Sequence, residues 1–265
     1  MAKRSTGRKG TVRSDDREDK LYVKSVGKAF RILEGFADST NAMSLSELAE
    51  AAELDKSATQ RLVHTMVKLG YLEKTSLGHR PGRRLLQRSF DYLRGHPLIV
   101  HSLPILAELR RDAQERIDLS LFDDVSMLYL VRLQSKRDSL YGYLSGRHVP
   151  TFCTSGGRAV LSKLPLEQVK DILNRSKLVK ATPKTAIAKE QILSRVQEAR
   201  EAGYAVVAEE MMVGEIACGV AILDDAGKPI GAVHVAGSLA EWSPPDFVKR
   251  FAPLAVHAAR AISAV

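Results

Sequence analysis

Apolar residues in the first third of the chain recur in short periodic segments separated by polar breaks. Residues 25–36 repeat apolar side chains at every third or fourth position, which predicts a helix. Ser44 followed by Glu47 forms a capping box and opens a second, short helix. A turn then leads into a third helix that ends at Gly70, with a predicted apolar side made of Ala58, Leu62, Met66 and Leu69. This order predicts a helix-turn-helix.

The opposite side of the third helix is polar and cationic. Donors and cations recur there at helical spacing, so they share one face. The segments 71–74 and 79–80, joined by a turn, predict a hairpin directly after this helix, which is typical of a winged helix-turn-helix. Helix starts also favour anions. We therefore expect DNA contacts from the start and polar side of the helix and from the wing: Lys56, Ser57, Thr59, Gln60, Arg61, His64 and Arg80.

A second pattern begins after residue 82. Residues 83–95 are helical and carry an apolar stripe suited to a partner: Leu85, Leu86, Phe90 and Leu93. Pro97 then indicates a boundary. Beyond it, apolar alternation predicts strands at 117–121, 127–133, 139–144, 204–208, 216–223 and 229–236. Helical spacing predicts helices at 98–116, 156–163, 166–174, 189–202 and 245–263. The second part is thus expected to be an α+β domain with antiparallel hairpins.

The patterns divide the chain into four parts. Residues 1–20 are polar, lack apolar periodicity and are expected to form a disordered basic tail. Residues 21–82 form the winged helix-turn-helix and 83–96 the linker helix. Residues 97–265 form the larger domain.

Composition narrows the class of protein. Apolar residues make up 45% and charged residues 27% of the chain, a globular balance. Residues 1–95 hold 19 Lys and Arg against 12 Asp and Glu, whereas 96–265 hold 21 against 19, so the basic excess accompanies the predicted DNA-binding part. Cys153 and Cys218 stand far apart, which indicates neither a disulfide framework nor a zinc site. Without a signal peptide or an apolar run of membrane length, a cytoplasmic protein is expected.

Several segments together resemble one family. The stretches SVGKAFRILEGF, SLSELAEAAELDKSATQRLVHTMVKLGYLE, TFCTSGGRAVLSKLP and AREAGYAVVAEEMMVGEIACGVAILDDAGKPIGAVHVAG resemble the IclR family of bacterial transcriptional regulators, in the same order and spacing. The resemblance covers roughly residues 22–263. It implies a winged helix-turn-helix, a linker helix and a GAF-like effector domain with an antiparallel sheet flanked by helices. It also assigns effector binding and oligomerisation to residues 97–265 and implies a homodimer or homotetramer on double-stranded DNA. Since the chain has no apolar run of membrane length, no membrane partner is expected.

The resemblance also places an effector pocket, and this chain departs from it. Members that bind small oxo-acids have polar residues where this chain has Val207, Ala217, His234 and Ala236. We therefore expect a small organic acid with an aromatic or otherwise apolar body. Its carboxylate is expected on the backbone N–H groups at Ser155 and Gly156 and on His234. The expected lining is Tyr141, Tyr143, Val149, Ser155, Gly156, Val207, Ala217, His234 and Ala236.

Three classes of function follow from these patterns. The first is an effector-gated regulator, expected to repress a catabolic operon; the second is a constitutive DNA-binding regulator without a ligand. The third is an enzyme on a GAF-like scaffold, for which Cys153 near His148 is the candidate thiol. The sequence shows no general base for that thiol, no group to orient such a base and no donors for an oxyanion hole. We therefore expect no catalytic residue, metal or cofactor. His234 on an apolar strand is either a ligand contact or a core histidine, and the wing arginines are either phosphate contacts or solvated surface.

Overall fold

The computed structural model describes residues 20–37, 39, 41–135 and 145–263. The chain divides into two compact units, one up to Leu93 and one from Arg94 onward. Residues 1–19 of the predicted basic tail, together with Tyr141 and Tyr143, lie outside the described residues. In the described part, no helix is long and apolar enough to cross a membrane.

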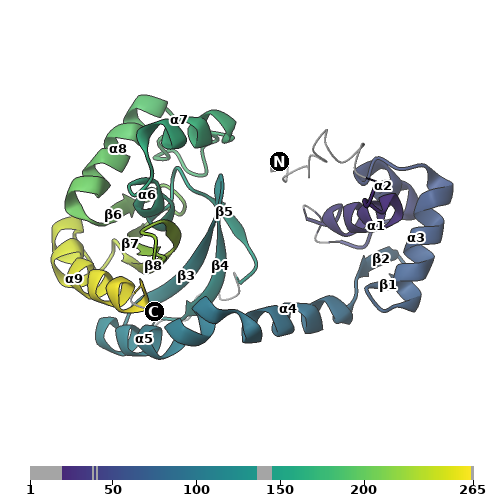
Figure 1. Ribbon diagram of the computed structural model, residues 1–265, viewed down its shortest axis with the longest axis horizontal. Helices are drawn as coiled ribbons and strands as arrows, with labels where there is room; N and C mark the ends of the chain where they lie inside the picture. Colours follow the sequence, from purple (N-terminus) through teal and green to yellow (C-terminus); the bar gives the residue numbers. More distant parts are fainter. Residues whose placement is uncertain (1–19, 38, 40, 136–144, 264–265) are drawn as a thin grey trace. The chain divides into compact units, whose positions relative to one another are not determined.

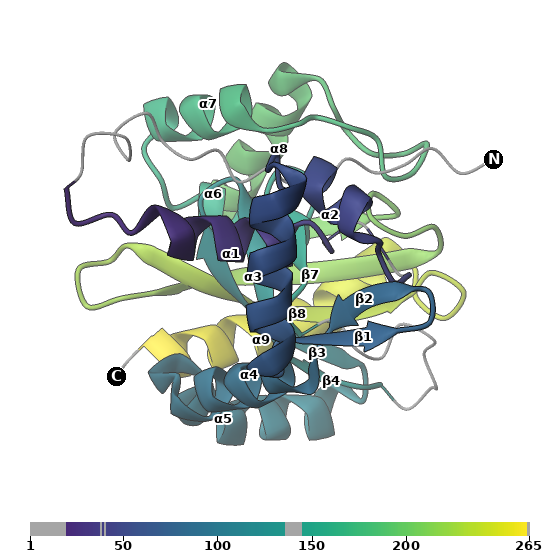
Figure 2. The same ribbon diagram turned by 90° about the vertical axis from the view of Figure 1, so that its right-hand side faces the viewer.

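The first unit contains four helices and one hairpin in its described part. Its elements are α1 (Lys24–Glu34), α2 (Leu45–Ala51), α3 (Lys56–Lys68), β1 (Leu72–Thr75), β2 (Gly78–Pro81) and α4 (Arg83–Gly95), the last of which ends just beyond the unit. The first three helices and β1 bury one apolar cluster that includes Ile32, Leu48, Val63 and Leu72. The hairpin directly follows α3 (Figure 2), as a wing does.

Local signals in the sequence determine where the two helices of the helix-turn-helix begin. The Ser44 hydroxyl accepts a hydrogen bond from the Glu47 backbone N–H, and the Glu47 carboxylate accepts one from Ser44, which completes the predicted capping box. Asp55 caps α3 through a bond from the Ala58 N–H at 2.7 Å. Each cap satisfies backbone donors that the first helical turn leaves unpaired.

The buried side of α3 agrees with the predicted one only in part. Met66 lies in the core as predicted, and Leu62 packs against the same cluster. Thr59 and Val63 also face the core, whereas Leu69, expected in the core, is 50% exposed. Thr59 can be buried because its hydroxyl donates to the backbone oxygen of Asp55 at 2.9 Å, so no polar group is left unpaired. The prediction that Thr59 contacts DNA is therefore wrong.

In its described residues, the second unit is a six-stranded sheet with helices on both faces. Its strands are β3 (Arg116–Asp123), β4 (Ser126–Leu133), β5 (His148–Pro150), β6 (Ala205–Ala208), β7 (Glu215–Leu223) and β8 (Pro229–Ser238). Their spatial order is β5-β4-β3-β8-β7-β6, and every neighbouring pair is antiparallel. The predicted strand at 139–144 falls outside the described residues, and β5 was not predicted.

The helices found in the described part of this unit form two layers. They are α5 (Pro97–Ala113), α6 (Ser155–Leu161), α7 (Leu166–Arg175), α8 (Lys189–Ala202) and α9 (Pro244–Ser263). In Figures 1 and 2, α6, α7 and α8 cover one face of the sheet, and α5 and α9 cover the other. Both faces are thus buried, so β7 and β8 consist largely of buried residues. The predicted α+β class is confirmed.

Candidate functional site

The exposed face of α3 carries the cationic and polar groups of the first unit. The side chains of Lys56, Ser57, Gln60, Arg61 and His64 are all exposed, as predicted for groups that reach a nucleic acid. Gln60 and Arg61 lie four and three residues before His64, so both are on the same helical face as His64, one turn away from it. This face can enter a major groove, where guanidinium and amide groups read base edges.

The wing holds its arginine in an ion pair. Arg80 donates to Glu73 across the hairpin through Nε at 3.1 Å and Nη2 at 3.0 Å. The hydrogen bond from Arg80, together with one from the Arg83 backbone N–H, lowers the pKa of Glu73. Arg80 is exposed, so its remaining donors can still reach a phosphate.

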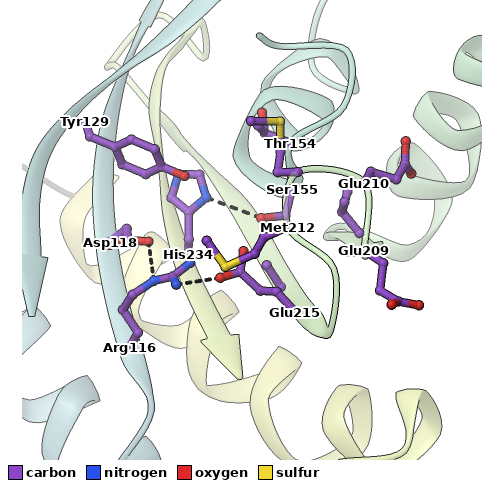
Figure 3. A pocket seen from close by; sticks show the side chains of 13 residues that line it. Arg116, Asp118, Tyr129, Thr154, Ser155, Glu209, Glu210, Met212, Glu215 and His234 are labelled. Carbon is purple, nitrogen blue, oxygen red and sulfur yellow. Dashed lines mark hydrogen bonds and ion pairs between the residues drawn. The ribbon is translucent and has the colours of Figure 1, made fainter. Parts of the chain in front are cut away.

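The second unit contains a small cavity beneath the layer of α6. Its volume is about 30 Å³, enough for ordered water but not for a drug-sized ligand, which takes pockets of about 300–1,000 Å³. Figure 3 shows charged and hydroxyl side chains from β3, β4, α6 and β7 around it, together with the imidazole of His234 from β8. The lining residues are Arg116, Asp118, Tyr129, Thr154, Ser155, Val207, Glu209, Glu210, Met211, Met212, Glu215, Ala217 and His234.

Charged residues on β3 form a network along one side of the cavity. Arg116 Nε lies 3.0 Å from Asp118 Oδ2, and its Nη1 lies 2.5 Å from Glu215 Oε2. Asp118 also accepts two bonds from Arg132 on β4, at 2.6 and 3.0 Å. Burial alone would lower the pKa of Arg116, but Asp118 and Glu215 raise it above its ordinary value, so the guanidinium stays charged.

His234 is buried on the cavity wall between two hydroxyl groups. Its Nε2 lies 2.7 Å from Ser120 Oγ, and its Nδ1 lies 3.3 Å from Ser155 Oγ. The Tyr129 ring packs at 5.5 Å between centroids. Burial lowers the pKa of His234 to about 4, more than the nearby Asp118 can offset. His234 is therefore a neutral imidazole that both lines the cavity and is hydrogen-bonded within the core.

A loop over residues 209–214, which we call the cavity loop, connects β6 to β7. Its Glu210 pairs with the buried Arg158 of α6 through two bonds of 2.6 and 2.8 Å. Glu209, at the start of the loop, is in the left-handed region with φ 59° and accepts a bond from the Gly214 N–H. Met211 and Met212 from this loop supply apolar surface to the cavity.

The predicted effector residues are only partly brought together. Ser155, Val207, Ala217 and His234 line the cavity. Val149 instead belongs to an apolar core cluster with Met127 and Tyr129, which corrects its assignment.

Gly156 and Ala236 also do not line the cavity. A Cβ on Gly156 would lie 2.1 Å from His234 Cε1, so this glycine makes room for the imidazole. Gly219 of β7 packs on the same peptide: a Cβ on it would lie 2.5 Å from Gly156 N. The expected carboxylate site on this backbone N–H is therefore covered by β7.

The charged residues of the network were missed by sequence reasoning, although the pattern of β3 contains a signal for them. Arg116, Asp118 and Ser120 alternate with apolar residues, which usually marks the solvent side of a strand. Here Asp118 is 1% and Ser120 0% exposed, because the polar face of β3 turns toward α6 and the cavity.

The candidate thiol has the environment of a core residue. Burial raises the pKa of Cys153 to about 12, and its Sγ lies 3.3 Å from Met211 Sδ. His148 is exposed and contacts Asp123 at 3.0 Å instead. In the part of the chain that the structure describes, no cluster of His, Cys, Asp and Glu could hold a metal ion.

A winged helix-turn-helix with an exposed cationic face, followed by a separate α+β unit, is an architecture typical of DNA-binding regulators. Residues 25–76 match the IclR helix-turn-helix domain, and residues 90–264 match the bacterial transcriptional regulator IclR C-terminal domain. The chain belongs to the IclR family, as the resemblance predicted. It is a DNA-binding regulator and not an enzyme.

Individual relatives are similar along nearly their whole length. The Pca regulon regulatory protein of Pseudomonas putida is 24% identical over 91% of this chain and 84% of its own. The transcriptional repressor IclR of Escherichia coli (strain K12) is 26% identical over 91% of this chain and 89% of its own. The crystal structure of an IclR homolog from Microbacterium hydrocarbonoxydans, complexed with 4-hydroxybenzoate, has a TM-score of 0.73 at 24% identity, covering 90% of this chain and 97% of that one.

The buried neutral His234 predicts a dependence of stability on pH. The unfolded chain protonates this imidazole near its ordinary pKa of 6.5, whereas the folded chain does so only near pH 4. The free energy of unfolding therefore falls as the pH falls through this interval, by roughly 3 kcal/mol for this group. The free energy of unfolding can be measured by urea titration of the full chain at several pH values between 7 and 4. It should fall less steeply with decreasing pH in His234→Asn than in the wild type. Parallel curves would show that His234 is not buried as a neutral base.

Proposed function

We propose that this regulator binds its operator through the exposed face of α3 and changes its affinity when a small organic acid binds in the second unit. The observation that supports the first part is the cluster of exposed donors on α3, opposite the buried Thr59, Val63 and Met66. Gln60, Arg61 and His64 contact base edges, and Lys56 and Ser57 at the helix start contact phosphates. Arg80 contacts a phosphate from the wing.

The effector proposal is supported by the cavity. Tyr129, Met211, Met212 and Val207 offer apolar surface for a ring or chain, and the charged network offers polar partners for an acid group. The relative from Microbacterium hydrocarbonoxydans was crystallised with such a molecule, 4-hydroxybenzoate. Because the cavity holds about 30 Å³, binding must displace the cavity loop or the side chains at its edge.

We further infer that the protein represses a catabolic operon and works in the cytoplasm, where bacterial DNA is found. One relative is described as a repressor and another as the regulator of a regulon. Ligand binding that weakens operator contacts would then permit transcription.

Arg61→Ala tests the role of α3. If the guanidinium reaches a base edge, specific operator affinity should fall by roughly 1–3 kcal/mol, or about five- to 150-fold, and the preference at one base position should relax. Band shifts with the operator and with a scrambled duplex measure both effects. Arg175→Ala, an arginine of the second unit paired with Asp124 and Asp171, is the matched control. Unchanged operator affinity in Arg61→Ala would refute the proposed reading face.

We propose that the first unit also supplies a dimer contact. Val26 and Phe30 of α1 are 51% and 59% exposed, and Leu86 and Phe90 of α4 are 74% and 60% exposed. Large apolar side chains at helical spacing on a surface mark a protein contact. A two-fold dimer would place two copies of α3 about one helical turn of DNA apart, or a multiple of it.

Phe90→Asp should weaken self-association, because a carboxylate would be buried in the apolar contact. Sedimentation should show a shift toward the monomer, relative to the wild type. Leu77→Asp, at the 82% exposed tip of the hairpin, is the control and should sediment as the wild type does. A wild-type protein that is monomeric both in solution and on DNA would exclude the proposed contact.

A further inference from the structure

Arg116 is distinguished by its charge among the residues around the cavity. Of the side chains that line it in the described part of the chain, only the guanidinium of Arg116 is positively charged, since His234 is neutral. The side chain of Arg116 is 15% exposed, so it lies near the edge of the cavity and not deep in the core. A carboxylate that enters the cavity therefore meets one cation.

The guanidinium of Arg116 has donors to spare. Asp118 occupies Nε and Glu215 occupies Nη1, and among the described residues Nη2 has no hydrogen-bond partner. A guanidinium carries five N–H donors in a planar fork that fits a carboxylate with two parallel bonds. Arg116 can thus bind a second carboxylate if one of its present partners leaves.

The two present partners differ in how firmly they are held. Asp118 is 1% exposed and also bonded to Arg132, so it would stay buried and paired without Arg116. Glu215 has Arg116 as its one cationic partner in the described part of the chain, and its side chain is 19% exposed. It can turn toward water without leaving a charge buried, so the desolvation cost of the exchange is small.

We propose that the carboxylate of the effector binds to Arg116 in place of Glu215, with Asp118 holding the guanidinium in position. This inference rests on the proposed function, in which the effector is an organic acid. It assigns the acid group to β3 and not to the backbone at Gly156, which β7 covers. The charge inside the cavity stays balanced, because one carboxylate replaces another.

The exchange also links the ligand to the cavity loop. The backbone of Glu215 closes this loop, since its oxygen accepts a bond from Glu209 N at 2.7 Å and its N–H donates to Met212 O at 3.3 Å. Release of the Glu215 side chain removes the ion pair that ties the end of the loop to β3. Met211 and Met212 can then move aside and enlarge the cavity around the body of the ligand.

Calorimetric titration of four full-length proteins tests this assignment. The probes are benzoate, 4-hydroxybenzoate and glyoxylate, with benzamide and 4-hydroxybenzamide as uncharged analogues. Glu215→Gln removes the competing charge. Whichever acid binds to the wild type should therefore bind at least threefold more tightly to this variant, whereas the affinity for the corresponding amide should not change. Arg116→Gln should weaken the acid at least tenfold. Arg175→Gln, which removes an arginine with two carboxylate partners outside the cavity, should leave affinity unchanged.

The outcomes separate this inference from the proposed function. If the wild type binds an acid but Arg116→Gln binds it within twofold of the wild type, the acid group lies elsewhere and the inference is overturned, while the effector class stands. If no acid binds to the wild type, the effector class fails and the inference with it. If Arg116→Gln unfolds below the assay temperature, the test rests on Glu215→Gln. An acid affinity in Glu215→Gln that is equal to or weaker than that of the wild type overturns the proposed exchange.

Discussion

The second unit depends on the buried ion pair between Arg158 and Glu210. Arg158 Nη1 and Nη2 bond the two carboxylate oxygens, and its Nε donates to Phe152 O at 2.9 Å. Glu210 also accepts the Ala186 N–H at 2.9 Å. The pair thus joins α6 to the segment before it, to the segment between α7 and α8, and to the cavity loop. Loss of one partner would leave an uncompensated buried charge, which costs about 3–5 kcal/mol.

The cavity is surrounded by charges that are already paired, and this shapes what it can bind. Glu210 is held by Arg158, Glu209 by Lys184, and Asp118 by two arginines. A ligand therefore gains little from charge unless it takes over an existing partner. This constraint favours a ligand that carries one acid group and an apolar body, since the acid can replace Glu215 while the body packs on Met211 and Met212. A ligand with many polar groups would compete with satisfied bonds.

Local patterns in the sequence were enough to predict most elements, because caps and apolar periods act within a few residues. The short helix expected from Ser44 is found as Leu45–Ala51. Groups whose partners come from distant strands could not be predicted in this way. Asp118 is paired with Arg132 on the next strand, and Ser120 is hydrogen-bonded to His234, which is distant in sequence. The burial of Thr59 was also missed, although its partner Asp55 lies only four residues before it. The family resemblance located His234 but not Arg116.

The central claim is that a ligand in the second unit controls how tightly the first unit binds DNA. Fluorescence anisotropy of a labelled operator, measured with and without a saturating acid that binds by calorimetry, tests it directly. Coupling between two sites in regulators is typically about 1–3 kcal/mol, so the operator Kd should change by at least about fivefold. Saturation of the ligand site without a change in operator Kd would contradict the account and leave a DNA-binding protein that does not respond to its ligand.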